Sequence, residues 1–134
     1  MQPDTTFWQA LTTLIASHTV VIDRLRGSAH PRYPELIYPL DYGYLENTSA
    51  GDGDGIDIWL GSLSTVNEAG NAKTLTGILC SFDTLKRDAE IKLLIDCSDE
   101  DIQIIRDFLR ELNALYIPNP AVEHALSNYV SRPA

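Results

Sequence analysis

Helical periodicity is confined to the two ends of the chain, and this limits the folds that the chain can form. Apolar residues recur at helical spacing from about Thr5 to His18, which predicts a first helix. Ser98 is a typical N-cap followed by acidic residues, and an apolar stripe that continues to Leu115 predicts a second helix. Asn119 and the proline that follows it predict the start of a third, short helix.

The middle of the chain predicts short strands. Its apolar runs alternate or are rich in β-branched residues, and glycine, proline and aspartate separate them. The extended runs are 19–24, 35–45, 56–60, 74–82 and 90–95. Strands between terminal helices indicate an α+β fold in which helices cover a small twisted sheet or barrel. At this length, residues 1–134 are expected to form a single domain.

The charge of the chain excludes one class of partner and leaves two interpretations open. Asp and Glu number 19 against 10 Lys and Arg, so the formal net charge is -9. Nucleic-acid binding is not expected, because phosphate backbones are held mainly by basic side chains. The acidic excess indicates either a means of staying soluble or a cation site.

No membrane segment and no secretion signal is expected. No part of the sequence approaches the roughly 18 apolar residues of a membrane span. Residues 1–20 lack the basic start and unbroken apolar run of a signal peptide. Cys80 and Cys97 lack the spacing of a metal or redox motif and are expected to be inert thiols. These features predict a cytoplasmic protein.

Asp52, Asp54 and Asp57 form the densest group of carboxylates in the sequence. Glycines alternate with the first two and let the backbone turn tightly. One interpretation is an acidic turn that only caps a hairpin in solvent. The other is a cation site, because Asp57 begins an apolar strand and clustered carboxylates repel one another without a cation between them. Oxygen ligands in such a loop favour magnesium, manganese or calcium over zinc.

Several motifs together resemble the family I soluble inorganic pyrophosphatases. The segment 52–58 (DGDGIDI) is similar to the family's D-x-D-P-x-D signature, and 38–44 (YPLDYGY) is similar to its YP-x-N-YGY segment. Asp83 and Asp88, near the ends of later strands, keep the spacing of two further family aspartates. Upstream, 20–23 (VVID) resembles its V-x-I-E strand and 32–33 (RY) its K-Y pair.

The resemblance implies an OB-like, five-stranded β-barrel with flanking helices. It also implies magnesium-dependent hydrolysis of inorganic diphosphate to two phosphates by a metal-activated water, with Mn²⁺ as an alternative ion. The implied metal ligands are Asp52, Asp57, Asp83 and Asp88. The implied catalytic residues are Asp54, which would orient or deprotonate the water, and Tyr42. The implied substrate contacts are Arg32, Lys92, Asp23 and Tyr38.

This sequence keeps fewer of the family's basic residues than of its acidic residues. Arg32 stands where the family has a phosphate-binding lysine, and Glu90 stands where another lysine is expected. The segment before Tyr38 that would carry a phosphate-binding arginine is shortened. Lys92 is expected to lie on the same strand face as Glu90 and to substitute for the missing lysine.

Two alternatives to diphosphate hydrolysis therefore stay open. One is a degenerate relative that binds metal, or has a regulatory role, without turnover. The other is a hydrolase of another small phosphoanhydride. The resemblance also implies assembly into a homo-oligomer.

Overall fold

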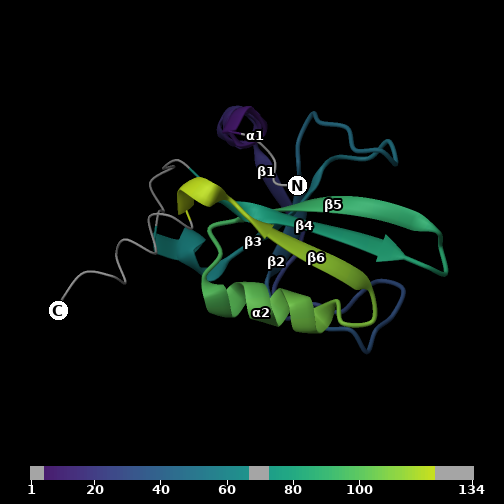
Figure 1. Cartoon of the computed structure of the whole chain (residues 1–134). Helices are drawn as coiled ribbons and strands as arrows, with labels where there is room; N and C mark the ends of the chain where they lie inside the picture. Colours follow the sequence, from purple (N-terminus) through teal and green to yellow (C-terminus); the bar gives the residue numbers. More distant parts are fainter. Residues whose placement is uncertain (1–4, 67–72, 123–134) are drawn as a thin grey trace.

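A computed structural model describes residues 5–66 and 73–122 of the chain. The helices are α1 (Thr5–Ser17), the 3₁₀ helix η1 (Ser62–Val66) and α2 (Asp99–Phe108). The strands are β1 (Val20–Arg24), β2 (Asp41–Leu45), β3 (Asp57–Leu60), β4 (Leu75–Asp83), β5 (Asp88–Ile95) and β6 (Asn113–Pro118). Figure 1 shows their arrangement. Helical residues begin at Pro120, where the third helix was predicted to start, and the rest of that prediction lies outside the described residues.

All six strands form one sheet, in the order β1-β2-β3-β5-β4-β6. Neighbouring strands are antiparallel except β3 and β5, which are parallel. The α+β class is thus confirmed. The order is linear with β1 and β6 at its edges, so in the described part of the chain the sheet is open and has six strands, whereas the resemblance implied an OB-like barrel of five.

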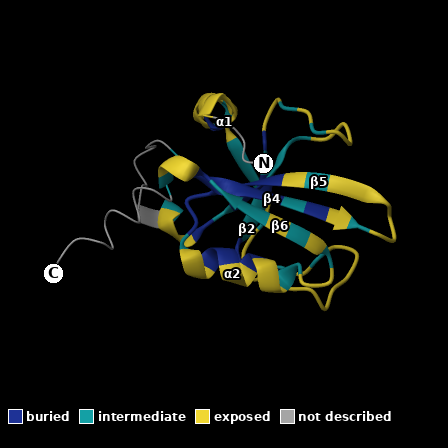
Figure 2. Ribbon diagram, in the orientation of Figure 1, coloured by how far each residue is buried: buried dark blue, intermediate teal, exposed yellow. Residues whose placement is uncertain are grey.

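One helix covers each face of the sheet (Figure 1). Side chains alternate between the faces along each strand. The first face packs against Trp8, Leu11, Leu14 and Ile15 of α1. The second face packs against Ile102, Ile105, Phe108 and Leu109 of α2. The middle of β3 and the buried ends of β4 and β5 supply the centre of both clusters, and the exposed parts of β4 and β5 extend away from them (Figure 2).

The predicted second helix is too long. Its apolar stripe was expected to continue to Leu115, but α2 ends with Leu109 as its C-cap. Residues 113–118 instead form β6, which pairs with β4 from Phe82 to Gly77. The spacing of Leu112 and Leu115 fits a helix, but the edge of β4 offers a full row of backbone hydrogen bonds that a short helix end cannot match.

The segment before β2 is folded back on itself. Tyr38 N donates to Ser28 O, Gly27 N donates to Tyr38 O, and a single bridge joins Ala29 to Ile37. We call residues 25–39 the basic loop, because Arg26 and Arg32 lie in it. A side chain at Gly43 would overlap the carbonyl group of Val21 on β1, which explains the glycine in the YGY segment.

The sequence predicted neither a membrane span nor a cysteine motif. Within 5–66 and 73–122, no helix is long and apolar enough to cross a membrane. Both cysteines are free, with Cys97 buried and Cys80 partly exposed.

Asp101 connects α2 to the loop after β3. It is 4% exposed, and its carboxylate accepts hydrogen bonds from Ser62 N (2.9 Å), Ser62 Oγ (2.8 Å) and Ser98 N (2.8 Å). Ser98 Oγ in turn accepts from Asp101 N, which completes a capping box. Burial would raise the pKa of Asp101, but these donors outweigh it and hold the pKa below its ordinary value.

Asp101→Ala is predicted to lower the free energy of unfolding by about 2–4 kcal/mol, because three donors lose a charged acceptor. Urea denaturation measures this loss. Since the pKa is lowered in the folded state, the stabilisation is present above about pH 4 and disappears as the pH falls through the folded-state pKa. The difference between the two proteins should therefore shrink in acid. Asp99→Ala, at an exposed acid of the same turn, is the control and should change stability by less than about 1 kcal/mol.

Candidate active site

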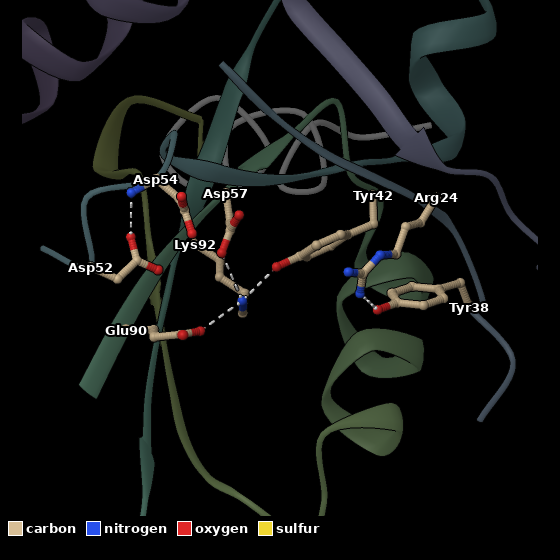
Figure 3. A network of polar contacts seen from close by, with 8 residues as sticks. All are labelled: Arg24, Tyr38, Tyr42, Asp52, Asp54, Asp57, Glu90 and Lys92. Atoms are coloured by element: carbon tan, nitrogen blue, oxygen red, sulfur yellow. Dashed lines mark hydrogen bonds and ion pairs between the residues drawn. The ribbon is translucent and has the colours of Figure 1, made fainter. Parts of the chain in front are cut away.

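The second face of the sheet has an apolar part and a polar part. Trp59, Leu79 and Leu94 lie under α2. Asp57 precedes Trp59 by two residues on β3, and Lys92 precedes Leu94 by two residues on β5, so both lie on this same face. Tyr42 of β2 pairs with Trp59, which places its ring at the border between the two parts. We call Tyr42, Asp57, Glu90 and Lys92 the polar cluster (Figure 3).

The Lys92 ammonium lies at the centre of the polar cluster. Its Nζ donates to Tyr42 Oη (2.6 Å) and forms ion pairs with Glu90 Oε2 (3.0 Å) and Asp57 Oδ2 (3.3 Å). The Lys92 side chain is 9% exposed, whereas those of Asp57 and Glu90 are 31% and 38% exposed. An ammonium has three N–H donors, so these contacts use all of them. Glu90 and Lys92 do share a strand face, as predicted.

The protonation states of the polar cluster follow from its contacts. Burial alone would lower the pKa of Lys92, but Tyr42, Asp57 and Glu90 raise it above the ordinary value. Burial raises the pKa of Tyr42, and the nearby Lys92 charge opposes this only in part. At neutral pH the cluster therefore holds a charged lysine and a neutral phenol.

The aspartate turn lies beside the polar cluster. It is the connection between the antiparallel strands β2 and β3, so the hairpin interpretation of the turn is correct in its geometry. Asp52 and Asp54 are exposed, and Asp52 Oδ1 accepts from Asp54 N (2.9 Å). In Figure 3 both side chains lie on the side of Asp57 and Glu90. Gly53 has a φ of 89°, a left-handed conformation that favours glycine at this point of the turn.

Asp83 and Asp88 lie farther away, where β4 turns into β5. They face each other directly in the strand register. Asp83 Oδ1 accepts from Leu85 N (2.9 Å) and Lys86 N (3.1 Å) within the turn, and Asp88 is exposed. Both share the second face with Lys92, but Asp88 precedes it by four residues, or roughly 13 Å of strand.

The predicted metal ligands are not gathered: Asp52 lies in the turn before β3, and Asp83 and Asp88 lie at the turn between β4 and β5. Among the residues that the structure describes, no three acidic, histidine or cysteine side chains form a group able to hold a metal ion. The donor chemistry still fits Mg²⁺, because Asp52 and Asp54 are exposed carboxylates and Asp57 is partly exposed beside them. Of the predicted metal ligands, Asp52 and Asp57 come from one motif, five residues apart in the sequence.

The predicted substrate contacts are dispersed. Tyr38 is buried in an aromatic cluster with Tyr42, Trp59 and Phe108. Asp23 is exposed at an irregularity of β1, between two residues that pair with β2. Arg32 is exposed in the basic loop, with its guanidinium 5.6 Å from the ring centre of Tyr33.

Sequence analysis missed Arg24. It ends β1, pairs with Tyr42 and donates to the hydroxyl group of Tyr38. Its place at the end of a predicted strand was the available signal. The irregularity at Asp23 changes which face of the sheet the Arg24 side chain lies on, and the sequence does not predict this irregularity. Glu90 was noted only as a departure from the family pattern, and the structure makes it a partner of Lys92.

Comparisons with known proteins agree with the fold and the motifs. The sequence profile of the family described as inorganic pyrophosphatase matches residues 16–127. Among solved structures, an inorganic pyrophosphatase from Helicobacter pylori is similar, with a TM-score of 0.52 and 19% sequence identity. The match covers 87% of this chain and 98% of that chain. At this identity the likeness concerns the fold. No curated protein sequence gives a significant match.

Lys92→Met is predicted to lower the free energy of unfolding by about 2 kcal/mol, because it leaves two carboxylates facing each other without a counter-charge. Adding Glu90→Gln should restore part of the loss by removing one of these charges. Urea denaturation measures both effects. Lys86→Met, at an exposed lysine of the β4–β5 turn, is the control. Equal stability of the Lys92 and Lys86 variants would contradict a structural role for the Lys92 ion pairs.

Proposed function

Because the chain belongs to the inorganic pyrophosphatase family, we propose that it hydrolyses inorganic diphosphate to two phosphates with Mg²⁺ as its cofactor. The observation that carries the proposal is the position of Asp57. This aspartate follows the turn that contains Asp52 and Asp54. Its side chain lies on the second face, where it forms an ion pair with Lys92 and lies beside Tyr42. One motif thereby supplies both exposed oxygen ligands and a fixed carboxylate.

The residues have distinct roles in this proposal. Asp52 and Asp57 would hold a first ion, and Asp83 and Asp88 would hold ions that enter with the substrate. When bound, Mg²⁺ would neutralise phosphate charge and lower the pKa of a water molecule. Asp54 is exposed and accepts the proton of the attacking water. Tyr42 keeps its proton because burial raises its pKa, so it offers a neutral hydroxyl beside the reacting groups.

Further parts of the proposal rest on the family resemblance alone. They are the substrate contacts of Arg32, Asp23 and Tyr38, the use of Mn²⁺ in place of Mg²⁺, and assembly into a homo-oligomer. A cytoplasmic location and a single domain formed by 1–134 stay predictions from the sequence. Lys92 contributes to this site as the cation that holds Asp57 and Tyr42 in place.

A second candidate function is metal binding, or a regulatory role, without turnover. The ion pairs of Lys92 favour it, because the ammonium already lies between Asp57 and Glu90 and uses its three donors there. A lysine in this state has no donor left for a phosphate group. Turnover distinguishes the two functions directly.

Phosphate release from diphosphate is predicted to require Mg²⁺ and to fall by about 10²–10⁴-fold in kcat for Asp54→Asn, since the variant cannot accept the proton of water. Asp107→Asn, at an exposed acid of α2, is the control and should keep the activity of the unaltered protein. Mg²⁺ binding by calorimetry without turnover of diphosphate would support the second function. A protein that neither binds Mg²⁺ nor releases phosphate would contradict both.

A further inference from the structure

Lys92 is a cation that contacts one of the carboxylates assigned above to a metal ion. Its Nζ lies 3.3 Å from Asp57 Oδ2 and 3.0 Å from Glu90 Oε2. The Lys92 side chain is 9% exposed, so water and salt do little to screen its charge from these partners. The chain therefore brings a positive charge of its own to Asp57.

The surroundings of Lys92 hold this charge in place. Its strand, β5, lies between β3 and β4 in the sheet. The ammonium donates to Tyr42 Oη (2.6 Å) and lies 5.0 Å from the centre of the Tyr42 ring. That ring packs edge-on against Trp59, with ring centres 4.8 Å apart. The ammonium cannot move away from Asp57 without leaving a hydrogen bond and two ion pairs.

Asp57 has one oxygen on each side of its carboxylate available for different partners. Oδ2 faces Lys92. Figure 3 shows the other oxygen directed away from the ammonium. The Asp57 side chain is 31% exposed, so this second oxygen can be reached from solvent. An ion that used it would share one carboxylate with the Lys92 ammonium, and two positive charges at that separation repel each other.

The lysine has two opposite effects on an ion at Asp57, and their sizes decide the outcome. Holding one short side chain in place strengthens ion binding by at most about tenfold in Kd. Repulsion between a unit charge and a divalent ion across a single carboxylate weakens binding by more than that, because the buried ammonium is poorly screened. The net effect of Lys92 is therefore to weaken binding.

We propose that Lys92 lowers the affinity of this site for Mg²⁺ because it shares Asp57 with the ion. The choice of Mg²⁺ and of Asp57 as its ligand rests on the proposed function. Lys92 thus sets how much Mg²⁺ the protein needs, in addition to holding Asp57 and Tyr42 in place. A lysine that only positioned Asp57 would have the opposite effect on the affinity.

Mg²⁺ binding measured by calorimetry at neutral pH, with no substrate present, tests the proposal. Lys92→Met should lower the Kd by about 10–100-fold, because the repulsion is removed. Lys92→Arg keeps the charge and should bind Mg²⁺ within about threefold of the unaltered protein. Arg106→Gln, at an exposed arginine of α2, removes one positive charge elsewhere and is the control. It should change the Kd by less than about twofold, since solvent screens its charge.

Two further measurements separate the effect on Mg²⁺ from an effect on folding. Circular dichroism shows whether each variant is folded. Lys92→Gln keeps an N–H donor and loses only the charge, so it should also lower the Kd and serves where Lys92→Met does not fold. Mg²⁺ should raise the urea midpoint of the Lys92 variants more than that of the unaltered protein, because tighter binding stabilises the folded state more.

A Kd for Mg²⁺ that rises or stays the same in folded Lys92→Met and Lys92→Gln would overturn the proposal. So would the absence of Mg²⁺ binding from the unaltered protein and from both variants. Tighter Mg²⁺ binding by the Lys92 variants of a protein that never releases phosphate from diphosphate would support the role of Lys92 and contradict the proposed function. The two proposals therefore fail on different measurements.

Discussion

The interaction of Lys92 with two carboxylates and a tyrosine is the constraint on which the polar part of the second face depends. Asp57 and Glu90 come from different strands and would repel each other without a cation between them. The ammonium supplies this charge from within the chain. The ion pairs also fix Asp57, so the aspartate turn that precedes it is anchored at one end. A metal ion at this turn would therefore meet one held carboxylate and two exposed ones.

The fold creates this site through the short length of α2. The helix covers Trp59, Leu79 and Leu94 on the second face and ends at Phe108. Farther along β3 and β5, the carboxylates of Asp57 and Glu90 stay partly exposed, while Lys92 is buried between them. Alternation along β3 and β5 then requires Asp57 and Lys92 to share the face of the apolar residues beside them. The same principle places Arg24 there through its pairing with Tyr42. Apolar packing and the polar cluster are thus two parts of one surface.

The sequence predicts the strand cores well because β-branched runs and breakers are local signals. Val20–Arg24 and Asp57–Leu60 lie inside the predicted ranges. Asn113–Pro118 does not, since pairing with β4 is a long-range interaction that overrides the helical spacing of Leu112 and Leu115. For the site, the motifs give Asp52, Asp54 and Asp57 as a group. The motifs do not predict which residues contact Lys92 or that Arg24 pairs with Tyr42, because both depend on strand register.

A crystal structure with Mg²⁺ and imidodiphosphate, a diphosphate analogue that resists hydrolysis, tests the central claim most directly. The claim is that Lys92 holds the carboxylates of the site. The expected result has Lys92 Nζ still within hydrogen-bond distance of Asp57 and Glu90 while the ion and the analogue are bound. A phosphate group bound to Lys92, with Asp57 turned away, would contradict it.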